Sequence, residues 1–98
     1  MTIKKNVEDT RLTILLSGRL DTSTAPSLEA ALQESLPGMT ELIFDFKELE
    51  YVSSAGLRIL LSAQKTMSKQ GSMVIRNVSE DIYEVFDITG FTDILTIE

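Results

Sequence analysis

Apolar residues in the first third of the chain follow first a strand pattern and then a helical one. Ile3–Val7 and Arg11–Ser17 have the composition of β-strands, and the polar turn between them predicts an antiparallel hairpin that Gly18 ends. The polar stretch Gly18–Pro26 then leads into a helix, whose first turn tolerates proline well. Pro37-Gly38 predicts the end of this helix. Its apolar residues recur at helical spacing and are Leu28, Ala31, Leu32 and Leu36.

Strands and helices alternate along the rest of the chain. Glu41–Phe46 is a nearly continuous apolar run, which predicts a strand buried on both faces, as in a parallel sheet. Lys47–Tyr51 is expected to be the loop that follows it. A second helix is expected from about Ser54 to Gln70, because apolar residues recur there with helical period.

The last third of the chain completes the alternation. Ser72–Asn77 reads as another interior strand, Ser79 as the cap of a third helix that Gly90 closes, and Ile94–Ile97 as a short last strand. The order β-β-α-β-α-β-α-β predicts an α/β fold. We expect one domain over residues 1–98, with a mostly parallel or mixed sheet of four to five strands and about three helices. The distribution of the helices over the two sheet faces stays open.

Composition limits the location of the protein. The chain has 98 residues, 43% of them hydrophobic, so that it can bury a real core. No apolar run approaches the roughly 18 residues of a membrane span, and Met1–Lys5 lacks the apolar region of a signal peptide. The chain has no cysteine, which fits a reducing interior. We therefore expect a cytoplasmic protein that does not insert into membranes.

Charge and missing residue types exclude several functions. A net charge of −6 argues against binding to nucleic acid. Without histidine or cysteine there is no Ser-His-Asp triad, Cys-His dyad or usual zinc site, and we expect no catalytic residues and no metal. Gly56 lacks the Walker spacing and its lysine, so no nucleotide cofactor is expected. A serine hydrolase would need Lys65 or Lys69 as base for Ser54, but both lie more than two turns along the helix.

Other carboxylates have structural explanations. Glu80 and Asp81 point in different directions from adjacent helix positions and suit the positive first turn of the third helix. Asp45 lies between two phenylalanines on an otherwise apolar strand. It can face a crevice at the end of the sheet, but capping the following loop is the favoured reading.

The segment Tyr51–Arg58 carries the candidate chemistry. Ser53 and Ser54 stand where the second helix begins, and either hydroxyl can accept a bond from a free N–H group of the first turn. The same helix end is partially positive and suits an anion or a phosphate. A serine here is either a plain cap or a place where phosphate can be added and tolerated.

At Tyr51–Arg58 the sequence resembles the STAS domain, and specifically the small anti-sigma factor antagonists. Weaker matches at Gly18–Asp21, Leu42–Phe46 and Thr89–Phe91 extend the resemblance over essentially the whole chain. The resemblance implies that an anti-sigma factor that is also a serine kinase phosphorylates Ser54. The unphosphorylated protein would bind this kinase and release the sigma factor. Phosphorylation would prevent the binding, and a phosphatase would restore it.

The sequence departs from the best-known family pattern on both sides of Ser54. Ser53 stands where aspartate is frequent, which makes it a rival phosphate acceptor, and Ala55 replaces a second hydroxyl residue, which favours Ser54. The resemblance also implies a docking surface made by the loop after the second strand and the start of the second helix. Its candidate partner-binding residues are Arg19, Asp21, Thr22, Ser23, Ser53, Ser54, Gly56 and Arg58.

Both regions of this surface have a plainer interpretation. The loop Arg19–Thr24 can be an ordinary capping loop ahead of the first helix, and Arg58 can be a solvated helix arginine as readily as a ligand for phosphate or partner. A related function is also open, in which the chain is a STAS docking subunit of a transporter-associated or stressosome-like assembly without a phosphorylation switch.

Overall fold

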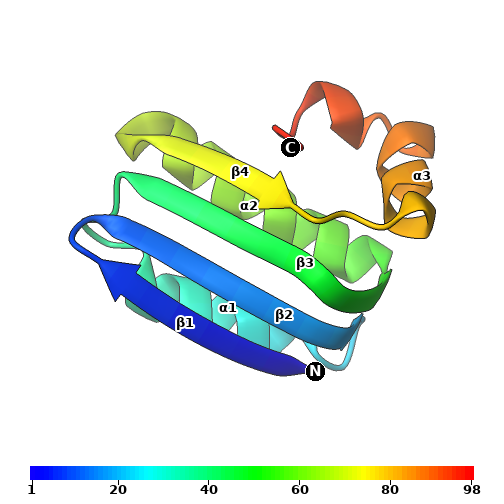
Figure 1. The fold of residues 1–98 in the computed structure, drawn as a ribbon, viewed down its shortest axis with the longest axis horizontal. Helices are drawn as coiled ribbons and strands as arrows, with labels where there is room; N and C mark the ends of the chain where they lie inside the picture. The colour runs from blue at the N-terminus through cyan, green and yellow to red at the C-terminus, as the bar shows by residue number, and fades with distance from the viewer.

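The computed structural model describes all residues from Met1 to Glu98 and contains one four-stranded sheet in the order β1-β2-β3-β4. Strand β1 (Thr2–Glu8) pairs antiparallel with β2 (Arg11–Leu20), which confirms the predicted hairpin. Strands β3 (Glu41–Val52) and β4 (Ser72–Arg76) continue the sheet in parallel with β2 (Figure 1). The sheet is therefore mixed, with its parallel part at the β4 side.

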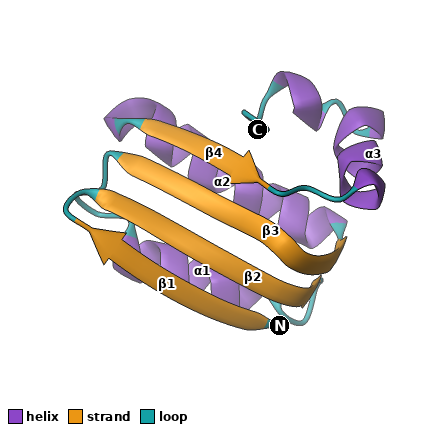
Figure 2. Cartoon of the chain, in the orientation of Figure 1, coloured by secondary structure: helices purple, strands orange, loops and turns teal.

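The two longer helices lie on the same face of the sheet. They are α1 (Ala25–Ser35) and α2 (Ser54–Gln70), and Figure 2 shows both behind the strands. Right-handed crossovers that add strands in one direction must place their helices on one side, which resolves the distribution that the sequence leaves open. Helix α3 (Glu80–Ile88) lies beyond the end of β4, followed by the short 3-10 helix η1 (Phe91–Asp93). None of these helices combines the length and apolar character that a bilayer crossing needs.

The core fills the space between the sheet and the helices. Leu12, Ile14 and Leu16 alternate along β2 and are fully buried, which is the period-two pattern of a strand with one face in the core. An aromatic chain runs from the sheet to α3: the Phe46 ring centroid is 5.8 Å from that of Phe44 and 6.4 Å from that of Phe86. These tilted contacts attach α3 to the end of the sheet.

The face of β3 that points away from α1 and α2 carries no helix (Figure 2). Ile43 is 8% exposed and lies between Thr13 and Val74, outside the main core. The carboxylate of Asp45 accepts hydrogen bonds from the backbone N–H of Lys47 (2.9 Å) and the side chain of Asn77 (3.0 Å). The expected burial on both faces therefore holds at Ile43 but not at Glu41 or Asp45, which are partly exposed. Asp45 caps the chain that follows, as expected.

Strand β3 is twice as long as predicted, and the expected loop over Lys47–Tyr51 is wrong. The register passes from Leu15 opposite Asp45 to Ser17 opposite Glu48, so β3 contains one extra residue there. A second shift follows Gly18. Each bulge reverses which side chains point inward. The buried residues Phe46, Leu49 and Val52 are therefore three positions apart and show no strand alternation.

The other differences concern two strand ends and the place of β4, which was expected inside the sheet and lies at its edge. Gly18 does not end β2, which continues to Leu20 through the second register shift. The expected last strand over Ile94–Ile97 is reduced to one parallel bridge between Ile97 and Ile75. Residues Phe91–Asp93 form η1, which is capped at Ile94. The chain therefore reaches the edge of β4 only at Ile97.

Phe86→Ala tests the attachment of α3 to the sheet. Because the Phe86 ring is fully buried against Phe46, its removal should lower the free energy of unfolding by about 3 to 5 kcal/mol, measured by urea denaturation. The matched control is Ile88→Ala, which truncates a side chain that is 76% exposed on the same helix and should change stability by less than about 0.5 kcal/mol. Equal losses in the two variants would contradict this packing.

Candidate functional site

Two loops that are distant in sequence meet at one edge of the sheet. Because β2 and β3 are parallel and Leu20 lies opposite Val52, both strands end at the same edge. The backbone N–H of Ser53 donates to the carbonyl of Leu20 at 2.8 Å, which ties the two strand ends together. The loop after β2 and the start of α2 therefore lie side by side at this edge.

Ser53 is the residue that caps α2. Its backbone is extended (φ −91°, ψ 175°), and its side-chain oxygen accepts a hydrogen bond from the backbone N–H of Gly56 at 3.3 Å. Its carbonyl accepts the first helical bond, from the N–H of Leu57 at 2.9 Å. Ser53 is half-buried, and its hydroxyl oxygen is engaged by the N–H of Gly56.

Ser54 has the opposite environment. It is the first residue of α2, its side chain is exposed, and no hydrogen bond of the structure involves its hydroxyl. It lies in the first turn, where the backbone N–H groups give the helix end a partial positive charge. Of the two adjacent hydroxyls, Ser54 is therefore the one that an external group can reach.

Gly56 contributes to this surface by bringing α2 close to β2. The residue is buried, and a Cβ atom at this position would lie 2.7 Å from Cγ of Leu20 and 3.2 Å from the Leu20 carbonyl oxygen. Only glycine permits this approach without displacement of the helix or of Leu20. Gly56 thus positions the serines and offers no side chain to a partner.

The loop after β2 is organised by Asp21. One carboxylate oxygen accepts hydrogen bonds from the Ser23 hydroxyl (2.8 Å), the Ser23 backbone N–H (3.0 Å) and the Thr24 backbone N–H (3.1 Å). The hydrogen bond from the Ser23 hydroxyl is the main cause that holds the pKa of Asp21 below its usual value. Thr22 and Ser23 are exposed at the loop tip, while Asp21 is half-buried and engaged internally.

Arg19 lies between the loop and the end of β3. Its Nε is 3.7 Å from the second carboxylate oxygen of Asp21, and its guanidinium carbon is 4.1 Å from the ring centroid of Tyr51. Arg19 and Tyr51 are direct partners across the parallel strands. The cation–π contact holds Arg19 over an aromatic ring that is itself 40% exposed. Sequence reasoning missed Tyr51 because this pairing depends on the two bulges.

Arg58 is placed beside Ser54 on the helix surface. The two residues are four positions apart, a spacing that puts side chains on the same side of a helix. Arg58 is exposed and takes part in none of the three ion pairs of the structure, which are Arg11–Glu41, Arg19–Asp21 and Arg76–Glu98. A free guanidinium is thus available within one turn of the exposed hydroxyl.

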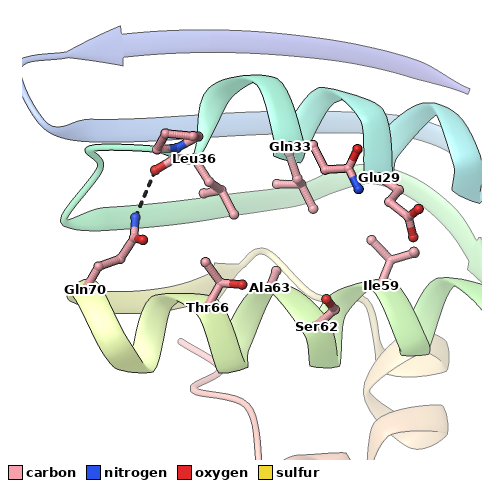
Figure 3. A pocket seen from close by; sticks show the side chains of 10 residues that line it. Glu29, Gln33, Leu36, Ile59, Ser62, Ala63, Thr66 and Gln70 are labelled. Atoms are coloured by element: carbon pink, nitrogen blue, oxygen red, sulfur yellow. Dashed lines mark hydrogen bonds between the residues drawn. The ribbon is translucent and has the colours of Figure 1, made fainter.

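Away from the serines, the structure has a groove but no cluster of metal-binding side chains. No three acidic side chains converge closely enough to hold a metal ion. A groove of about 510 Å³ lies between α1 and α2 (Figure 3). Gln70 bounds it by donating to the backbone carbonyls of Leu36 (2.8 Å) and Met39 (2.6 Å). Neither Ser53 nor Ser54 lines this groove.

The sequence and the fold are similar to those of known proteins. Residues 2–98 match the family model of the STAS domain. The anti-sigma-B factor antagonist of Bacillus subtilis is 33% identical over 96 residues, which cover 97% of this chain and 86% of that protein. The chain belongs to the STAS domain family and, within it, groups with the anti-sigma factor antagonists.

Two solved structures share the fold at lower identity. The anti-sigma factor antagonist SpoIIAA in its unphosphorylated form superposes with a TM-score of 0.78 at 19% identity, over 99% of this chain and 87% of that one. The phosphorylated form of the Bacillus cell fate determinant SpoIIAA gives a TM-score of 0.77 at 20% identity, over 99% and 91% of the two chains. The fold of this chain thus resembles both forms equally well.

Alanine substitutions should separate the two serines by stability. Ser53→Ala removes the cap of α2 and should lower the free energy of unfolding by about 1 kcal/mol. Ser54→Ala removes a hydroxyl without partners and should change it by less than about 0.5 kcal/mol. Urea denaturation of both variants measures the difference. A larger loss for Ser54→Ala than for Ser53→Ala would mean that the capping assignment is wrong.

The pKa of Asp21 makes a pH-dependent contribution to stability. Because its pKa is lowered in the fold, ionised Asp21 stabilises the protein fully above its unfolded pKa of about 4, and this contribution is lost as the pH falls through the folded pKa. The stability difference between wild type and Asp21→Asn, measured by urea denaturation at several pH values, should therefore be constant near neutral pH and shrink in acid.

Ser23→Ala should raise the pKa of Asp21, because it removes the hydroxyl that donates to the carboxylate. Carboxyl NMR titration measures this pKa, and an unchanged value would contradict the assigned cause.

Proposed function

We propose that this protein is an anti-sigma factor antagonist that phosphorylation of Ser54 switches off. The unphosphorylated protein binds an anti-sigma factor serine kinase in the cytoplasm, and the sigma factor is released. Phosphorylation of Ser54 prevents this binding, and a phosphatase restores it. The protein needs no cofactor and catalyses no reaction. The observation that carries the proposal is the contrast between Ser53, whose hydroxyl caps α2, and Ser54, whose hydroxyl is exposed and unpaired.

The electrostatic surroundings of Ser54 favour a phosphate group there, so that the fold can tolerate phosphorylation. A phosphoserine adds a charge of about −1.5 to −2 and three acceptor oxygens. The N-terminus of α2 supplies partial positive charge, and the exposed guanidinium of Arg58 lies one turn away. The similarity of the fold to both forms of SpoIIAA is consistent with a switch that leaves the fold intact.

The effect on binding then arises at the interface. A partner surface that accommodates the neutral Ser54 hydroxyl beside Thr22 and Ser23 would have to bury or repel a dianion after phosphorylation. A loss of about 3 kcal/mol is sufficient to weaken binding about 100-fold. Arg19 and Asp21 act mainly by holding the neighbouring loop in shape, because their charged groups already contact Tyr51, Ser23 and each other.

Phosphate mapping tests the proposal. The protein is incubated with ATP and anti-sigma factor kinases from its own source, and modified residues are located by mass spectrometry. Wild type and Ser53→Ala should each gain one phosphate on Ser54, while Ser54→Ala should gain none, because of the two adjacent serines only Ser54 has an exposed, unpaired hydroxyl. Circular dichroism of all three proteins checks that each is folded.

Two outcomes would contradict this function. Phosphate that persists in Ser54→Ala and disappears in Ser53→Ala would assign the switch to Ser53. No phosphate on any folded form would favour the alternative of a constitutive STAS docking subunit in a transporter-associated or stressosome-like assembly.

A further inference from the structure

The negative charge of the protein is concentrated in its last segment. Residues 1–76 contain nine acidic and nine basic side chains, whereas residues 77–98 contain six acidic and no basic ones. The whole net charge of −6 therefore resides in α3, η1 and the chain after them. Such a concentration of one sign creates a local field that the other three quarters of the molecule do not share.

Three acidic residues and one tyrosine share the outer face of α3. Glu80, Tyr83, Glu84 and Asp87 follow the i, i+3, i+4, i+7 spacing of one helix side. All four are exposed, and the Tyr83 ring is 46% exposed. None of the three acids takes part in an ion pair. This stripe lies opposite Ile82 and Phe86, which hold the helix on the core.

The same stripe lines a groove. The hollow of about 480 Å³ has apolar contributions from Val78, Tyr83 and Ile97, and its acidic rim includes Glu84 and Asp87. Glu98 also lines it, but its carboxylate is paired with Arg76 at 2.9 Å. The groove therefore combines apolar side chains with three carboxylates, those of Glu80, Glu84 and Asp87, that form no ion pair within the protein.

The positions of Glu84 and Asp87 are not explained by a stabilising effect on α3. Glu84 is four positions from Glu80 and three from Asp87, so like charges face each other on one helix side and repel. Asp87 lies in the last turn, where the negative end of the helix disfavours an acid, and no basic residue is present there. Glu80 alone gains from its place in the first turn. The arrangement of Glu84 and Asp87 thus lowers the stability of α3.

We propose that this outer face of α3 docks a basic amphipathic helix of a partner protein. Lysine or arginine side chains of the partner would pair with Glu80, Glu84 and Asp87, and an apolar side chain between them would pack on Tyr83. None of the residues around Ser54 lines this groove, so the interaction is additional to the proposed antagonist function. Charge complementarity selects a cationic segment, and the exposed Tyr83 ring favours one with an apolar residue at its centre.

NMR titration with a defined peptide tests this surface. A synthetic amphipathic helical peptide of leucine and lysine is added to the ¹⁵N-labelled protein, beside the same peptide with glutamate in place of lysine. The lysine peptide should bind saturably, with amide shifts concentrated in α3, Val78 and Ile97. The glutamate peptide should cause no shifts there. Shifts of the lysine peptide centred elsewhere, or no saturable binding, would overturn the proposal.

A pair of charge-matched variants distinguishes binding at this face of α3 from general attraction by the net charge of the protein. Glu84→Gln/Asp87→Asn should weaken binding of the lysine peptide about tenfold, because it removes two of the pairing carboxylates. Glu29→Gln/Glu34→Gln removes the same net charge from exposed positions of α1 and should leave the affinity unchanged. The α3 variant should also melt about 3 °C higher, since it relieves repulsion. Equal weakening by the two variants would overturn the site, whatever the melting temperatures.

Discussion

The parallel pairing of β2 with β3 determines where the candidate functional residues meet. It places the ends of both strands at one edge, where the N–H of Ser53 bonds the carbonyl of Leu20 and Gly56 packs directly on Leu20. The loop after β2 and the start of α2 are far apart in sequence and adjacent for this reason alone. Ligand sites outside the carboxyl ends of parallel strands are common in α/β proteins, because the loops there face solvent from a rigid sheet.

At this edge, some polar side chains hold the structure together, while their neighbours are exposed to solvent. Ser53 satisfies a free N–H of the helix, whereas Ser54 leaves its hydroxyl to the solvent. Asp21 accepts hydrogen bonds from Ser23 and Thr24 within its own loop, whereas Thr22 is exposed at the loop tip. A surface built in this way can change charge at Ser54 without losing the contacts that hold it. The acidic face of α3 differs, because its carboxylates contribute no such contact to the fold.

Much of the fold was predictable, since its helices are amphipathic and the first part of β2 alternates regularly. The bounds of α2 follow from the serine pair, the apolar period and Gly71. The second half of β3 was not predictable, because two bulges reverse its inward side and destroy the alternation. The serines and the loop were predicted from their motif. The contact of Arg19 with Tyr51 was not, because it depends on the bulged register, and the choice of Ser53 as cap depends on local geometry.

The most direct test is a comparison of the protein before and after phosphorylation of Ser54. One sample series gives both the affinity for the anti-sigma factor, by calorimetry, and the ¹⁵N–¹H spectrum. The account predicts binding that is at least about 100-fold weaker after phosphorylation, with shift changes confined to the first turn of α2 and the loop after β2. Unchanged affinity, or shift changes throughout the core, would contradict it.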